Sequence, residues 1–174
     1  NPNTVYAGSA SGGLWRSYTG GIGPNAWEYI PTGFPVLGVS AVVVSPQDSN
    51  TIYIGTGEVY NYQNTGSGTV ERTTRGTYGI GILKSVDGGQ TWTKSLDWAY
   101  DDLRGIQDMK INPLDPNIVL AATSEGFYKS IDAGQSWQQK HSVLMTTDIE
   151  YKPGDTSVIY IASGNSGSPG SGIY

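Results

Sequence analysis

The chain has 174 residues, 25 of them glycine, and a formal net charge of −5 at pH 7. This length fits one domain, while the few scattered Lys and Arg residues exclude a nucleic-acid groove and disfavour binding to an anionic membrane. The sequence has no cysteine and no run of 18 apolar residues, so it excludes disulfides, thiolate metal sites and membrane insertion by a helix.

Short apolar runs separated by turn residues follow one another along the chain, which is typical of an all-β protein with almost no helix. One kind of run recurs four times, as VYAG at Val5–Gly8, IYIG at Ile52–Gly55, VLAA at Val119–Ala122 and IYIA at Ile159–Ala162. Three of these runs follow a Pro/Asp turn and an earlier strand: VSAVVV, IQDMKI or TDIEY. Each run is followed, after a loop, by Gly and another strand: GLWRS, GILKS, GFYKS and a truncated GIY.

The repeating unit therefore has four strands, a to d, and this pattern is typical of a β-propeller blade. We predict a partial β-propeller of four-stranded antiparallel blades, with about three and a half blades in residues 1–174. The predicted blade boundaries are 1–34, 35–98, 99–142 and 143–174, with truncated ends. Because a propeller closes to protect its edges, we expect the remaining blades of the same ring as a partner. The opening NPNTVYAG has neither Met nor a signal-like segment, which indicates a processed product or an excerpt.

An octapeptide occurs twice where strand c should turn into strand d, as SVDGGQTW at Ser85–Trp92 and SIDAGQSW at Ser130–Trp137. Aspartate commonly accepts hydrogen bonds from its own turn, so we expect a structural role rather than a catalytic or metal-binding one. The fifth place is Gly in both copies, whereas the fourth place is Gly in one copy and Ala in the other. We therefore predict that only the fifth place needs a positive φ. The tryptophans are expected to open strand d and to pack between blades. The residues with an expected structural role are Ser85, Asp87, Gly89, Thr91, Trp92, Ser130, Asp132, Gly134, Ser136 and Trp137.

These octapeptides resemble the Asp-box, or BNR, repeat of sialidases, sortilin-type propellers, xyloglucan-cleaving glycosidases and photosystem assembly factors. The longer stretch IYIGTGE…GIGILKSVDGGQTW, preceded by VSAVVVSPQDSN, is similar to secreted sortilin-like repeat proteins of bacteria. The resemblance covers nearly the whole chain and implies a propeller that is secreted or on the cell surface of a bacterium. It implies little about function, because these families share turns rather than chemistry. The first unit departs from the pattern, since Thr19 stands where Asp would, and a looser turn is expected there.

In such a blade the a–b and c–d turns lie on one face, and the b–c loops and d–a links lie on the other. The candidate binding face therefore consists of 9–12, 58–79, 123–125 and 163–171, with the links that follow each strand d. Its most informative part is the insertion at 59–78, expected as a long loop rich in aromatic and charged residues. Aromatic rings beside carboxylates and amides suit sugar recognition, whereas the alternative is a surface loop that packs on its own backbone. The predicted ligand-binding residues are Glu58, Tyr60, Tyr62, Arg72, Arg75, Tyr78, Trp98 and Tyr100.

Hydrolysis of a glycosidic bond needs two carboxylates about 5–9.5 Å apart, and the candidates are Glu58, Glu71, Asp101 and Asp102. A sialidase is disfavoured because the chain has four arginines and no Arg-Ile-Pro segment. Xyloglucan-type cleavage is less excluded, since a second carboxylate could come from the rest of the ring. We therefore predict an extracellular or cell-surface scaffold that binds a glycan or protein without metal or cofactor. The alternatives are a glycoside hydrolase on the same propeller and a purely architectural module of a large adhesin.

Overall fold

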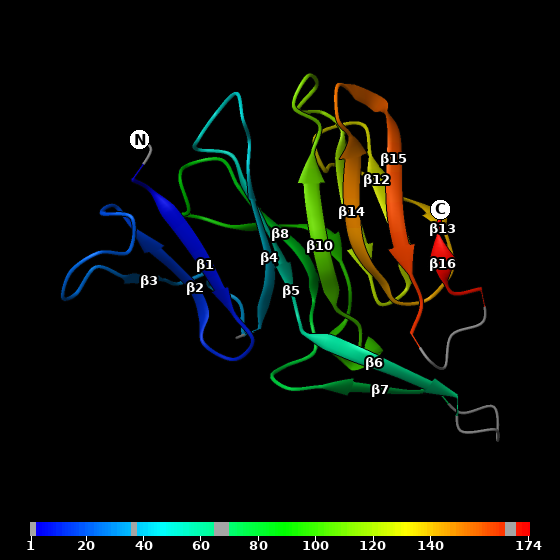
Figure 1. Ribbon diagram of the computed structural model, residues 1–174. Helices are drawn as coiled ribbons and strands as arrows, with labels where there is room; N and C mark the ends of the chain where they lie inside the picture. Colours follow the sequence, from blue (N-terminus) through cyan, green and yellow to red (C-terminus); the bar gives the residue numbers. More distant parts are fainter. Residues whose placement is uncertain (1–2, 36–37, 65–69, 166–169) are drawn as a thin grey trace.

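The computed structural model describes residues 3–35, 38–64, 70–165 and 170–174 (Figure 1). Four antiparallel sheets follow one another along the chain and are called blades 1 to 4. Blade 1 consists of β1 (Val5–Ser9), β2 (Gly13–Ser17) and β3 (Glu28–Ile30). Blade 2 consists of β4 (Val39–Val44), β5 (Ile52–Thr56), β8 (Gly81–Ser85) and β9 (Thr93–Asp97). Blade 3 consists of β10 (Ile106–Ile111), β11 (Val119–Thr123), β12 (Gly126–Ser130) and β13 (Gln138–His141). Blade 4 consists of β14 (Thr146–Lys152), β15 (Asp155–Ser163) and β16 (Gly172–Ile173).

The predicted all-β fold class is confirmed, because the sheets have the strand order and antiparallel pairing of propeller blades. The helix found in the described ranges is a single 3-10 turn, η1 (Tyr100–Asp102), and no helix there is long and apolar enough to cross a membrane. Each sheet lies inside one of the four predicted blade segments. The remaining blades of the ring stay a prediction, although exposed Trp15 and Tyr29 on blade 1 and Tyr160 on blade 4 fit surfaces that such blades would cover.

The insertion that was expected to be a loop is a β-hairpin, made of β6 (Val59–Asn64) and β7 (Val70–Thr74). Its β-branched and aromatic residues favour strands. A β-bulge between Val59 and Asn61 shifts the alternation by one residue, so that Val59 and Tyr62, three residues apart, both pack against the blades. The Gly/Ser/Thr spacer at 65–69 and part of the loop at 163–171 lie outside the described residues. In Figure 1 the hairpin extends from blade 2 across the lower ends of blades 3 and 4.

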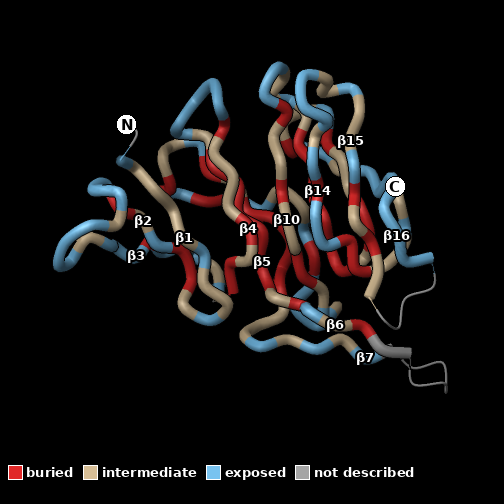
Figure 2. Tube along the Cα trace, in the orientation of Figure 1, coloured by how far each residue is buried: buried red, intermediate tan, exposed pale blue. Residues whose placement is uncertain are grey.

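The core lies between the blades, so both faces of an inner sheet are apolar (Figure 2). Leu14 and Ile30 of blade 1 pack against Ile54 and Leu83 of blade 2. On the opposite face of blade 2, Tyr53 packs in one cluster with the side chains of blade 3. Successive residues of a strand point to opposite faces, which explains why strands such as IYIG are apolar without alternation.

Candidate functional site

Both octapeptide turns hold their aspartate with hydrogen bonds from within the turn. The Asp87 carboxylate accepts the N–H groups of Gln90 and Thr91 at 3.0 and 2.9 Å, and the Thr91 hydroxyl at 2.5 Å. The Asp132 carboxylate accepts the N–H and hydroxyl of Ser136 at 2.9 and 2.5 Å. These hydroxyl and N–H bonds lower the pKa of each carboxyl to about 2. The local hydrogen bonding agrees with the predicted structural role.

The first serine of each turn has a role that the sequence pattern alone did not specify. The buried Ser85 hydroxyl oxygen accepts the N–H groups of Asp87 and Gly89 at 3.3 and 2.9 Å, and the hydroxyl donates to the Asp87 carboxylate at 2.7 Å. Ser130 makes the same three contacts in the second turn. In blade 1, Ser17 accepts the N–H groups of Thr19 and Gly21, although this turn has no aspartate. The signal was present in the sequence, because strand c ends in serine in all three units.

The prediction about backbone conformation was wrong at the fourth place of the turn. Both glycines at the fifth place have positive φ, but so do Gly88 at 73° and Ala133 at 55°. A left-handed conformation at alanine costs about 1–2 kcal/mol, so the surroundings must stabilise it. They do so through the carbonyl of the fourth residue, which accepts hydrogen bonds from the preceding blade. The Arg16 guanidinium donates to Gly88, and the Tyr53 hydroxyl and Lys84 ammonium donate to Ala133, at 2.7–2.9 Å.

The turns predict a specific acid sensitivity. The folded-state pKa of Asp87 and Asp132 is about 2, below the ordinary value of 3.8. Their contribution to stability is therefore complete above about pH 4 and is lost as the pH falls towards 2. We expect Asp87→Asn combined with Asp132→Asn to flatten the pH dependence of the unfolding free energy between pH 4 and 2, measured by urea denaturation. Asp101→Asn is the control because no described group donates a hydrogen bond to that carboxylate, and parallel profiles would contradict the expectation.

We call the side of the blades that carries the β6–β7 hairpin, the b–c loops and the d–a links the hairpin face. An ion-pair cluster holds the hairpin against the neighbouring loops of this face. The Arg72 guanidinium on β7 makes two hydrogen bonds of 3.0 Å to the two carboxylate oxygens of Glu125, in the b–c loop of blade 3. Arg104 lies 3.7 Å from the same carboxylate and 3.5 Å from Asp102. The hydroxyl of Ser124 donates to Glu125 at 3.1 Å. Arg72, a predicted ligand-binding residue, thus has a structural partner. Glu125 lies in the stretch 123–125 of the expected binding face, but no pattern in the sequence indicated its pairing with Arg72.

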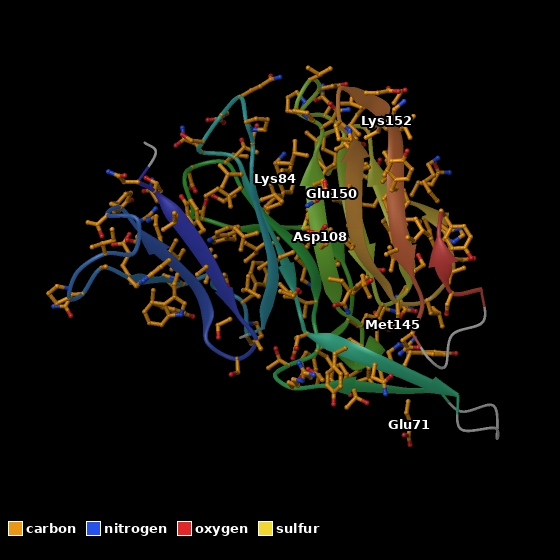
Figure 3. All side chains as sticks on the ribbon, in the orientation of Figure 1. Glu71, Lys84, Asp108, Met145, Glu150 and Lys152 are labelled. Atoms are coloured by element: carbon orange, nitrogen blue, oxygen red, sulfur yellow. The ribbon has the colours of Figure 1, made fainter. Side chains whose placement is uncertain are left out.

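Contacts on the inner side of the hairpin reach as far as blade 4. Val59 and Tyr62 form a buried cluster with Met145, which Figure 3 shows between the blades and the hairpin. The Asn165 amide, in the b–c loop of blade 4, donates to Asn61 and to the Tyr62 carbonyl at 2.7 and 3.1 Å. Gln107 of blade 3 donates to the Val59 carbonyl. The hairpin therefore covers loops that were expected to form the binding face themselves.

The predicted aromatic residues divide into a buried and an exposed group. Tyr62 is 8% exposed and Trp98 is 6% exposed, so their rings pack the structure and are not available for stacking. Tyr60 and Tyr100 are 43% and 47% exposed. The Arg75 guanidinium stacks 4.3 Å from the centre of the Tyr60 ring, and Tyr78 meets Tyr100 edge to face. The Tyr78 hydroxyl also donates to the Arg72 carbonyl, so the ring that supports Tyr100 is itself held in place. Tyr60 is supported by Arg75, whose side chain is 70% exposed.

The four candidate carboxylates differ in their surroundings. Glu58 accepts the N–H of Arg75 at 3.1 Å and lies 3.8 Å from its guanidinium. Asp102 accepts the N–H of Ala99 and lies near Arg104. Glu71 points away from the blades at the lower edge of Figure 3. Asp101 is exposed on η1, with no ion pair or hydrogen bond from a described residue. Among the described residues, no three His, Asp or Glu side chains cluster as a metal site would require.

Fold and repeated turns together define this chain as part of a β-propeller. No family model matches it. It is 26% identical over 168 residues to a xyloglucanase from Hypocrea jecorina (strain QM6a), covering 88% of this chain and 18% of the enzyme. The structure of an ancestral GH74 enzyme matches 92% of this chain with a TM-score of 0.66 and 19% identity, over 20% of its own length. The extracellular domain of a putative one-component system from B. thetaiotaomicron matches 98% with a TM-score of 0.54 and 17% identity, over 19% of its length. The chain thus spans about one fifth of each of these proteins.

Proposed function

We propose that the protein to which this chain belongs acts on a xyloglucan-type polysaccharide, and that this chain supplies part of its glycan-binding face. The observation that carries the proposal is the pair of exposed, supported rings Tyr60 and Tyr100 on the hairpin face. Exposed rings can stack on the apolar faces of sugars, while the Arg75 guanidinium beside Tyr60 can donate hydrogen bonds to the hydroxyls. The similarity to a xyloglucanase supports this substrate class. The relatives also support a location outside the cell or on its surface.

Binding is testable in the full-length protein with a xyloglucan heptasaccharide and isothermal titration calorimetry. Removing one ring should weaken binding about 2–10-fold, because an aromatic contact is worth about 0.5–1.5 kcal/mol. We therefore expect Tyr60→Ala and Tyr100→Ala each to raise Kd by this factor. Leu114→Ala, an exposed apolar residue in the a–b turn of blade 3, should bind like the parent. Parent-like affinity in both tyrosine variants would contradict the proposed face.

The comparisons favour a hydrolase over a scaffold without catalytic activity, so we also propose hydrolysis as the activity of the whole protein. Glu58 and Asp102 lie beside arginines and Glu71 points away, which leaves Asp101 as the carboxylate that this chain could contribute. A glycosidase needs a second carboxylate opposite the first, which would come from another part of the ring.

The hydrolase proposal predicts that Asp101→Asn abolishes xyloglucan turnover by the full-length protein and leaves oligosaccharide binding within about twofold. The matched control is Asp97→Asn, an exposed carboxylate on β9 that pairs with Lys94. Reducing-sugar release measures turnover. Unchanged turnover in Asp101→Asn would remove this residue from catalysis. A parent protein that binds the glycan and never cleaves it would support the scaffold instead.

A further inference from the structure

A cleft of about 560 Å³ opens between blades 1 and 2 on the turn face, which is the face that carries the octapeptide turns and the a–b turns. Blade 1 contributes Tyr6, Arg16 and Tyr18 to its lining, and the turns of blade 2 contribute Asn50, Asp87 and Gln90. This volume lies within the range of ligand pockets, about 300–1,000 Å³. The hairpin face is on the opposite side of the blades, so the cleft is separate from the glycan-binding face proposed there.

The cleft presents little free charge. The Arg16 guanidinium donates to Glu28 at 2.6 Å and to the Gly88 carbonyl at 2.9 Å. The Asp87 carboxylate accepts hydrogen bonds from the N–H groups and hydroxyls of its own turn. A ligand that carried a charge would have to compete with these partners. The lining therefore favours a neutral ligand.

One aromatic ring gives the cleft a platform. Tyr18 is 52% exposed, and the Arg16 guanidinium lies 4.7 Å from its ring centre, which orients the ring without covering it completely. Asn50 and Gln90 are exposed amides on the facing turns of blade 2. An exposed ring opposite amides matches a sugar, which has an apolar ring face and hydroxyls that both donate and accept hydrogen bonds.

The next junction provides an internal comparison, because strand c and the octapeptide turn line a cleft there too. The rest of that lining comes from β9, whereas in the first cleft it comes from β1 and from the end of strand a and the a–b turn of blade 2. Between blades 2 and 3, Lys84 replaces Arg16 and Val86 replaces Tyr18. Tyr53, which corresponds to Tyr6, is buried and donates to Ala133. The cleft there is about 270 Å³ and has no aromatic residue in its described lining. Hydrogen bonds to the fourth residue of the turn thus connect the blades at both junctions. Among the described residues of the two junctions, the larger cleft with an exposed aromatic ring lies only between blades 1 and 2.

We propose that the cleft between blades 1 and 2 binds a neutral saccharide, as a second glycan site on the face opposite the hairpin. The position and chemistry of this site come from the cleft alone, and only the choice of a xyloglucan probe rests on the proposed function. A second site on the opposite face would hold a polysaccharide chain near the propeller independently of the hairpin face.

The test is calorimetry on the full-length protein with the xyloglucan heptasaccharide and with cellotetraose. Tyr18→Ala removes the platform and should weaken one class of sites about 2–10-fold. Ser49→Trp fills the cleft from an exposed position in its lining and should abolish that class of sites without removing a contact of Arg16. The control is Ile131→Ala. Ile131 is exposed and follows Ser130 in the second octapeptide turn as Tyr18 follows Ser17 in blade 1, and this variant should bind like the parent. Thermal unfolding checks that each variant is folded.

The outcomes separate this proposal from the hairpin-face proposal. Loss of one class of sites in Ser49→Trp, with the other class lost in the Tyr60→Ala and Tyr100→Ala double variant, supports both. Loss in Ser49→Trp with unchanged binding in the double variant supports the cleft and overturns the hairpin face. Parent-like binding of both probes by folded Tyr18→Ala and Ser49→Trp overturns the cleft site. A parent protein that binds neither oligosaccharide overturns it as well.

Discussion

Replacing Tyr53 with alanine is expected to lower the unfolding free energy of the intact propeller by about 3–5 kcal/mol, the usual cost of deleting a large buried aromatic side chain. The ring is 1% exposed and packs between blades 2 and 3. Burial raises the pKa of its hydroxyl to about 12, so the hydroxyl stays neutral and donates to the Ala133 carbonyl at 2.7 Å. The substitution would remove both the packing of the ring and its hydrogen bond to the next blade. Urea denaturation measures the change in the unfolding free energy.

Tyr53→Phe is the matched control, because it keeps the ring and removes the hydroxyl alone. The Lys84 ammonium still donates to the Ala133 carbonyl at 2.8 Å, so this acceptor does not lose its last partner. We expect a loss of about 0.5–1.5 kcal/mol, the net value of one hydrogen bond. Equal losses in the two variants would show that packing of the ring between blades 2 and 3 contributes little to stability, contrary to what its burial predicts.

Glu125→Gln is expected to undock the β6–β7 hairpin. The side chains of Arg72 and Glu125 are 19% and 12% exposed, and Arg104 shares the same carboxylate. Neutralising Glu125 leaves two partly buried guanidinium groups without their common anion, and breaking such a pair costs about 3 kcal/mol or more. Trypsin should then cut at Arg72 or Arg75 about a hundredfold faster than in the parent protein. This holds under conditions in which the cleavage rate is proportional to the fraction of molecules with an undocked hairpin.

The control for this variant is Glu150→Gln in blade 4. Glu150 pairs with Lys110 at 3.0 Å but its side chain is 64% exposed, so the loss should stay below about 1 kcal/mol. Trypsin should cut this variant at the parent rate within the hairpin. If Glu125→Gln were as resistant as Glu150→Gln, the buried contacts of Val59 and Tyr62 would be sufficient to hold the hairpin.

Local patterns in the sequence were enough to predict the blades. The repeated apolar runs predicted most strands within a residue or two, because each strand must satisfy the same pattern of burial between two neighbours. The exception is β15, which begins at Asp155, four residues before the run IYIA. The octapeptides likewise predicted local hydrogen bonding of Asp87 and Asp132, since these bonds span at most four residues. The positive φ of Ala133 could not be predicted, because the contacts that stabilise it come from Tyr53 and Lys84 in another blade.

The location of the candidate site in the chain was predictable, but the exposure and the contacts of its side chains were not. Local patterns were sufficient for the β-propeller blades, their hydrogen-bonded turns and an insertion rich in aromatic and charged residues. The folded arrangement was needed to show that Tyr62 and Trp98 are buried while Tyr60 and Tyr100 are exposed, and that Arg72 pairs with Glu125. Strands and turns depend on residues close together in the chain. The exposure and pairing of a side chain depend on distant residues, as in the contact between Arg72 and Glu125, which are 53 residues apart.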